Sequence, residues 1–130
     1  MWFERKIKLL LSAGRPVIVE SLPDYGFHEL AEELRRTLPN VILVQATPED
    51  AADTVLIGNL LADATEKAFS ARLFGTGLPY SYGISVLRRH LHLIEPLTLI
   101  LCNAEYAAGL GGAFLAFNQP NVSVFVHFQR

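Results

Sequence analysis

The sequence predicts an α/β fold, a three-layer sandwich in which a mainly parallel sheet of about four to five strands lies between helices. Two observations support this prediction. Four short runs of apolar and β-branched residues are spread along the 130 residues, and segments with the periodicity of amphipathic helices separate them. Strands that alternate with helices are joined by right-handed crossovers, which place helices over both faces of a parallel sheet.

The predicted strands are residues 16–20, 41–44, 97–101 and 122–126. The first three are apolar almost throughout, as expected for parallel strands that are buried on both faces. The fourth runs close to the last residue. We therefore expect either a piece of a longer chain or a small protein whose sheet edge pairs with another chain.

Apolar residues at helical spacing mark two helices between these strands. The first stripe consists of Phe27, Leu30, Ala31, Leu34 and Leu38, and the second of Ile84, Leu87, Leu91 and Ile94. A further amphipathic helix is predicted at residues 3–11, ahead of the first strand.

Capping and turn residues predict the remaining boundaries. Residues 48–69 are expected to form one longer helix, with Thr47 as its N-cap and Pro48 at its first position. A loop is expected at residues 74–79, followed by a helix that Ser81 caps. Residues 109–112 contain three glycines and predict a flexible point before a short helix that ends at residue 117.

Composition narrows the classes of function. Hydrophobic residues make up 51% of the chain and charged residues 18%, which favours a sheet covered on both faces or an apolar surface for a partner. The formal net charge of -2 gives no reason to expect direct contact with nucleic acid. No apolar run reaches the ~18 residues of a membrane span, so a cytoplasmic location is the expectation. One cysteine excludes an internal disulfide and a multi-cysteine zinc site.

The loop after the first strand has the frame of a phosphate-binding loop without its chemistry. A P-loop requires G-x-x-x-x-G-K-[ST], with a lysine that neutralises phosphate and a hydroxyl that holds Mg²⁺. Here Gly26 keeps the second glycine position and Ser21 replaces the first, with Asp24 between them. Phe27 stands in the place of the lysine and His28 in the place of the serine or threonine. The pattern predicts a vestigial site.

The third strand is similar to a Walker B strand, an apolar run that ends in two acidic residues which hold Mg²⁺ and orient water. Cys102 and Asn103 occupy the two acidic positions, and Glu105 follows two residues later, out of register. A magnesium anchor is therefore not expected here.

Residues 115–130 resemble the sensor strand of the same superfamily, with Arg130 as its trailing arginine. The order and spacing of the three motifs resemble the ATPase core of AAA+ and STAND proteins over most of the chain. The segment Pro-Asp-Tyr-Gly-Phe-His resembles the P-G-Y-G-K-T loop of large LuxR-type (MalT-like) bacterial transcription regulators. This resemblance implies a cytoplasmic role in bacterial transcription regulation, with DNA contacts made by a domain outside these residues.

The sequence thus predicts that residues 1–130 form one degenerate NTPase-like domain that acts through contacts with a protein partner or with further copies of itself. No catalytic residue, metal or cofactor is expected, and ATP hydrolysis is not. The vestigial ligand-binding positions are Ser21, Asp24, Gly26, Phe27, His28, Cys102, Asn103 and Glu105.

Two other classes of function remain open. One is a sensor that binds a small molecule or nucleotide without hydrolysis, through Gly26, His28 and the neighbouring backbone amides. The other is an enzyme that uses Cys102, Glu105 or His127. Strand order tests the kinship itself, because a P-loop core has its first strand beside its fourth, whereas a flavodoxin-like sheet has it between the second and third.

Overall fold

The computed structural model describes residues 16–21, 27–51, 53–117 and 119–129, so the helix predicted at residues 3–11 lies outside the described part. The strands are β1 (Val17–Ser21), β2 (Val41–Gln45), β3 (Leu97–Cys102) and β4 (Val122–Gln129). The helices are α2 (Phe27–Thr37), α3 (Thr54–Phe69), α4 (Tyr80–Arg89), α5 (Leu91–Ile94) and α6 (Ala108–Leu115). Two 3-10 turns complete the order, η1 (Pro48–Asp50) and η2 (Ala104–Tyr106).

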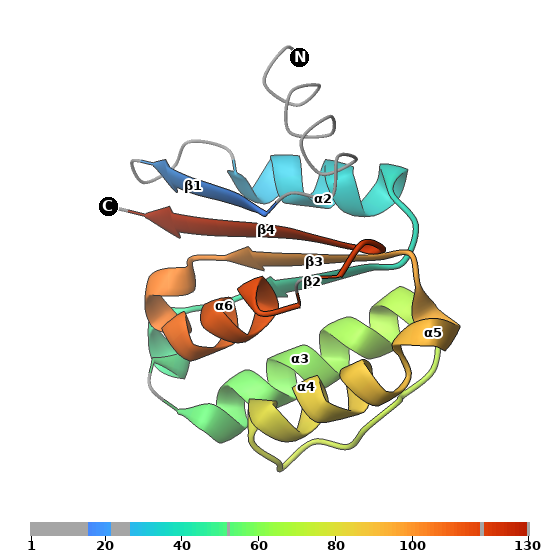
Figure 1. The fold of residues 1–130 in the computed structure, drawn as a ribbon. Helices are drawn as coiled ribbons and strands as arrows, with labels where there is room; N and C mark the ends of the chain where they lie inside the picture. The colour runs from blue at the N-terminus through green and yellow to red at the C-terminus, as the bar shows by residue number, and fades with distance from the viewer. Residues whose placement is uncertain (1–15, 22–26, 52, 118, 130) are drawn as a thin grey trace.

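The four strands form one sheet in the order β1-β4-β3-β2, and every pair is parallel. The predicted α/β fold with a parallel sheet is therefore confirmed, at four strands among the described residues. β1 lies beside β4 at one edge and β2 forms the other edge (Figure 1). The order is not the flavodoxin-like one, in which β1 would lie between β2 and β3.

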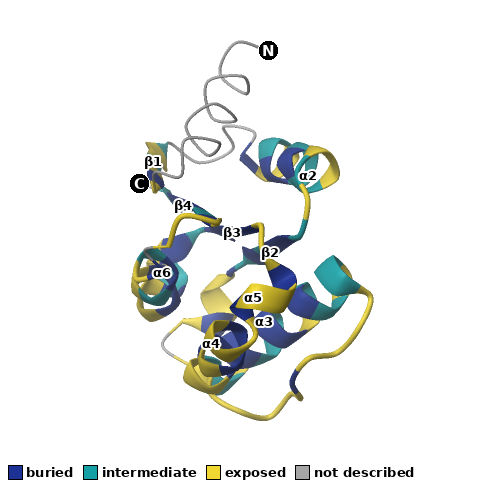
Figure 2. Ribbon diagram, turned by 45° about the vertical axis from the view of Figure 1, so that its right-hand side comes forward, coloured by how far each residue is buried: buried dark blue, intermediate teal, exposed yellow. Residues whose placement is uncertain are grey.

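Helices cover both faces of the sheet (Figure 1). α2 lies over one face, and α3, α4 and α6 lie over the other. The smaller core cluster joins α2 to the sheet and includes Phe27, Leu34 and Phe125. The larger cluster fills the opposite face, where Leu61 of α3 and Phe114 of α6 are fully buried. Figure 2 shows the burial of the central strands between these layers.

Both predicted apolar stripes face the core. In the first, Ala31 and Leu34 are fully buried on α2. In the second, all four residues are buried, although the helix is divided at His90, which separates α4 from α5. The periodicity thus identified the buried faces correctly, while the break within the second helix was not predicted.

The single helix predicted over residues 48–69 is wrong at its start. The Asp50 carboxylate accepts hydrogen bonds from the Thr47 backbone N–H at 2.8 Å and from its hydroxyl at 3.0 Å, which closes a separate 3-10 turn. α3 begins only at Thr54, where the Asp53 carboxylate accepts from two backbone N–H groups of the first turn, both at 3.0 Å. Asp53 is the true N-cap because it satisfies two donors that no residue of the helix can reach.

Two smaller predictions also fail. The loop before α4 is present, but the helix begins at Tyr80 with Pro79 at the N-cap, so Ser81 is a residue of the helix and not its cap. The glycines at residues 109–112 lie inside α6, which ends at Leu115. Glycine has a low helix propensity, yet all three lie within the helix. At Gly109 the helix lies so close to Tyr80 that an added Cβ would collide with the Tyr80 hydroxyl oxygen.

None of the helices in the described part of the chain is long and apolar enough to span a membrane.

A matched pair of glycines tests the packing of α3 against the loop that precedes α4. A Cβ added at Gly58 would collide with the Leu78 carbonyl oxygen, and the backbone at Tyr80 lies within 2.9 Å of it. We expect Gly58→Ala to lower the free energy of unfolding by roughly 1–3 kcal/mol. Gly112 meets nothing within 4 Å, so Gly112→Ala should raise it by about 0.5–1 kcal/mol. Urea denaturation of both variants measures the difference, and equal effects would contradict the packing described here.

Candidate functional site

The carboxyl ends of β1, β3 and β4 lie at the same end of the sheet, since all strands run parallel (Figure 1). In sheets of this kind, ligands bind at the carboxyl ends of the strands. Four residues meet there through side-chain or backbone contacts, and we call them the Ser21–His127 cluster: Ser21, Phe27, Asn103 and His127. Three of the four were predicted as site residues.

His127 is the centre of the cluster. Its side chain is only 1% exposed, and its Nε2 lies 2.8 Å from the Ser21 Oγ. The backbone N–H of Asn103 points at Nδ1 over a longer distance of 3.5 Å. An N–H can only donate, so we assign the ring proton to Nε2, which donates to the Ser21 hydroxyl.

This tautomer argues against nucleophilic catalysis by Ser21. A histidine activates a serine by accepting its proton, and a carboxylate usually orients the ring from the other nitrogen. Here Nε2 donates to the serine, and Nδ1 faces a backbone N–H. The pair therefore has the hydrogen-bond direction of a structural contact.

Phe27 closes the cluster from the first residue of α2. Its ring is stacked on the His127 imidazole, with 4.1 Å between the centroids and 19° between the planes. Only 7% of Phe27 is exposed. Phe27, which stands where the P-loop pattern has its lysine, is therefore part of the core beneath α2. It packs in the same cluster as Phe125.

Burial controls the charge of His127. Desolvation lowers the pKa of His127 below its ordinary value of 6.5, while the negative charge of Glu105 opposes the change. Burial has the larger effect because the imidazolium form would lose its hydration without gaining a direct contact with a carboxylate of the described residues. His127 is therefore neutral at pH 7.

Asn103 ties β3 to β2. It has the left-handed backbone conformation (φ 61°, ψ 47°), which asparagine tolerates better than most residues. Its side-chain amide donates to the Ala46 carbonyl at 3.2 Å, and the Ala46 N–H donates to the Cys102 carbonyl at 3.0 Å. Asn103, predicted at the second acidic position of a Walker B-like strand, thus joins the ends of β3 and β2.

Cys102 and Glu105 have separate environments. Cys102 is 4% exposed on the α2 side of the sheet, and burial, with the Glu32 charge as a smaller cause, raises the pKa of its thiol to about 12. The thiol therefore stays protonated, which does not suit a nucleophile. Glu105 is exposed, and its carboxylate accepts from the Gln129 N–H at 3.0 Å, next to the end of β4.

The remaining predicted site residues are not brought together by the described structure. His28 is exposed on the first turn of α2. Asp24 and Gly26 lie outside the described residues. No group of three or more histidine, cysteine, aspartate or glutamate residues could hold a metal ion within the described ranges.

Sequence reasoning underestimated His127. The predicted fourth strand ended at residue 126, whereas β4 continues to Gln129. A longer strand gives Phe125 and His127 the same face by alternation, and Phe125 is fully buried. That alternation was the available signal, but only the pairing of β1 with β4 places Ser21 within reach of the ring.

The described residues thus define an α/β protein with a parallel sheet whose strand ends carry a compact polar and aromatic cluster. No known protein family matches the sequence, and a search of curated proteins also finds no match.

The depressed pKa of His127 predicts how stability depends on pH. Between the unfolded value near 6.5 and the lower folded value, the unfolded chain binds a proton that the native protein does not. Neutral His127 therefore makes its full contribution to stability above the pKa of the unfolded chain. This contribution is lost as the pH falls from there toward the lower pKa of the folded protein. We expect the wild-type free energy of unfolding to decrease between about pH 7.5 and 5.5, above the range in which most carboxylates titrate.

The His127→Gln variant should be less stable at pH 7.5 but lose less stability over this range. His92→Gln, which replaces an exposed histidine on α5, is the control. Urea denaturation at each pH measures both. An unchanged slope in His127→Gln would show that another group causes the pH dependence.

Proposed function

We propose that this protein is a non-catalytic module of P-loop-like architecture that acts through protein contacts. The observation that carries the proposal is the position of Phe27, buried and stacked on His127 at the start of the helix that follows β1. In a P-loop, a lysine at this point contacts phosphate. Here Phe27 supplies no positive charge, its ring packs into the core, and the neighbouring imidazole is neutral.

The strand order supports the architectural part of the proposal. β1 lies beside β4, as expected for a P-loop core, and the carboxyl ends of β1 and β3 lie at the same end of the sheet because all strands run parallel. The proposal therefore keeps the relation to AAA+ and STAND cores that the three sequence motifs suggest.

Energetics argue against nucleotide binding by this edge. ATP carries several negative charges, and burying charge without compensation costs several kcal/mol, where each ~1.4 kcal/mol is a factor of ten in affinity. Cys102 is protonated and Asn103 is bound to Ala46, so neither supplies the anionic oxygen that Mg²⁺ requires. Hydrolysis is therefore not part of the proposed function.

The biological setting extends the proposal one step. By resemblance to LuxR-type regulators, the module would belong to a bacterial, cytoplasmic transcription regulator. It would contact a protein partner or another copy, and DNA would be bound outside these residues. Such a module would keep the α/β architecture of these regulators, and its own side chains would take the place of ligand contacts.

Thermal unfolding with and without ~5 mM Mg-ATP, Mg-GTP and their diphosphates tests the proposal. We expect no shift in Tm and no release of phosphate above the blank. A ligand at 100 times its Kd would stabilise the protein by about 2.7 kcal/mol, which corresponds to several degrees for a domain of this size. Such a shift would contradict the proposal and favour a nucleotide sensor.

A further inference from the structure

β2 is the edge of the described sheet opposite β1, and part of its backbone faces away from β3. The Thr98 N–H donates to the Asn40 carbonyl at 3.2 Å, and the Ala46 N–H donates to the Cys102 carbonyl at 3.0 Å. Backbone groups of alternate residues in a strand point to the same side. Asn40 and Ala46 therefore face β3, whereas the N–H and C=O groups of Leu43 and Gln45 face outward.

The residue types of β2 do not protect this edge. Edge strands usually avoid pairing with other chains by means of charged side chains, proline, bulges or a covering element. β2 reads Val-Ile-Leu-Val-Gln, without charge or proline. A strand of this composition at an edge is suited to pairing with another strand.

A groove runs along the outward side of β2. Its floor is formed by Leu43, Val44 and Gln45, and the groove has a volume of about 260 Å³. Its walls come from two helices, α2 on one face of the sheet and α3 on the other: Glu32, Arg35, Leu60, Asp63, Ala64 and Lys67. Figure 2 shows β2 at the sheet edge with α2 above it and α3 below it.

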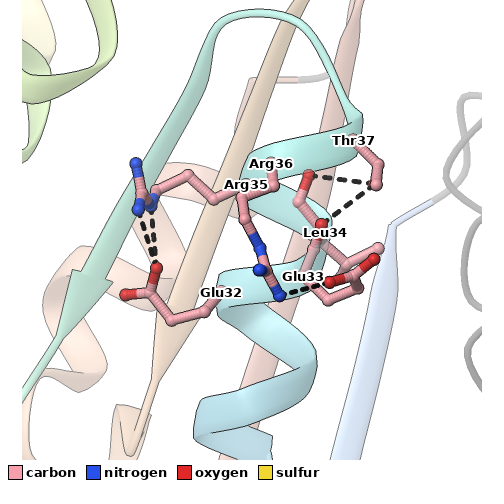
Figure 3. Close-up of polar contacts among 6 residues, drawn as sticks. All are labelled: Glu32, Glu33, Leu34, Arg35, Arg36 and Thr37. Carbon is pink, nitrogen blue, oxygen red and sulfur yellow. Dashed lines mark hydrogen bonds and ion pairs between the residues drawn. The ribbon is translucent and has the colours of Figure 1, made fainter.

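Of the charged side chains on these walls, Lys67 is available to an acidic partner. Arg35 forms an ion pair with Glu32 at 2.9 Å on the α2 wall (Figure 3), and Asp63 forms one with Arg72 at 2.9 Å. No ion pair joins Lys67 to a carboxylate within the described part of the chain. The Arg35 guanidinium is the main reason that the pKa of Glu32 lies below its ordinary value, and the Lys67 charge adds to it.

The groove determines what kind of strand can pair with β2. A second copy would present its own β2, which α2 and α3 of that copy flank in the same way. The β2 of that copy reads Val-Ile-Leu-Val-Gln and offers no acidic residue to Lys67. A free extended segment has no flanking helices and can enter the groove.

We propose that the groove along β2 binds an extended segment of a partner protein, which pairs with Leu43 and Gln45 as an added strand. The side chains of the segment alternate between the two walls. Apolar residues pack beside Leu43 on the α2 side, and an acidic residue lies beside Lys67 on the α3 side. This inference rests on the proposed function, whose protein contact it assigns to a specific edge.

The test uses a blocked peptide of about seven alternating valine and glutamate residues, long enough to span β2 at ~3.3 Å per residue. We expect the amide resonances of Leu43 and Gln45 to shift as it binds, and their hydrogen exchange to slow. The amides of Ile42 and Val44 already face β3 and should change less. Two peptides serve as controls, one with lysine in place of glutamate and one N-methylated at alternate amides, and neither should bind.

Variants of the protein separate charge from backbone pairing. Lys67→Glu should weaken binding of the valine–glutamate peptide by on the order of tenfold, while Lys67→Arg should retain it. Arg89→Glu, on the exposed side of α4, makes the same change in net charge and should have little effect. Gln45→Pro removes one outward N–H without breaking the ladder to β3, and should also weaken binding. Thermal unfolding checks that each variant is folded.

The outcomes separate this inference from the proposed function. Peptide binding that leaves the Leu43 and Gln45 amides unchanged, or equal binding of the lysine peptide, would overturn the edge assignment. So would the absence of binding while nucleotides still fail to raise Tm, and in that case the proposed function would stand. A nucleotide-induced rise in Tm would instead overturn the proposed function, whatever the peptides do. Dimers that Gln45→Pro abolishes would show that a second copy occupies the groove and would overturn the choice of partner.

Discussion

The parallel pairing of β1 with β4 brings together Ser21, Phe27 and His127, three members of the Ser21–His127 cluster. Val19 lies opposite His127 in the register, and Ser21 lies opposite Gln129. α2, the next described element after β1, begins with Phe27, whose ring is stacked on the imidazole. Residues separated by about a hundred positions in the sequence thus form one contact because the first strand lies beside the last. The loss of this pairing would separate the serine, the phenylalanine and the histidine together.

The cluster completes the packing at the carboxyl ends of the strands, where proteins of this architecture bind ligands. His127 stays neutral because it is desolvated, and Phe27 covers one face of its ring. Asn103 uses its amide to join β3 to β2. Ser21, Phe27 and Asn103, which were predicted at ligand-binding positions, therefore all make contacts within the protein. The lateral edge formed by β2 differs, since β2 combines outward backbone groups with a groove between α2 and α3.

Local patterns in the sequence predicted the strands and the buried helix faces, because burial on both sides of a parallel sheet leaves runs of apolar residues. Helix ends were harder to predict. Thr47 and Asp53 are both good capping residues, and only the hydrogen bonds of Asp50 decide that the helix starts at the second. The glycines of α6 indicate a break by propensity alone, whereas all three lie within the helix, and Gly109 lies closely against Tyr80.

The site was predictable only in part, because its contacts are long-range. Ser21, Phe27 and Asn103 could be placed at strand ends from motif spacing. The contacts of His127 could not, since they depend on the pairing of β1 with β4 and on a strand that continues beyond its apolar run. The groove along β2 was likewise inaccessible to sequence reasoning, because the position of β2 at the edge follows from the order of all four strands.

In the proposed function, Phe27 and its contacts with His127 take the place of the phosphate contacts of a P-loop. The most direct test is an NMR titration of the wild-type protein with Mg-ATP up to several millimolar, following the amides of Ser21, Phe27 and Asn103 and the His127 ring. The account predicts that these resonances stay in place throughout the titration. A saturable movement of all four would show that nucleotide enters this edge, and would contradict the account.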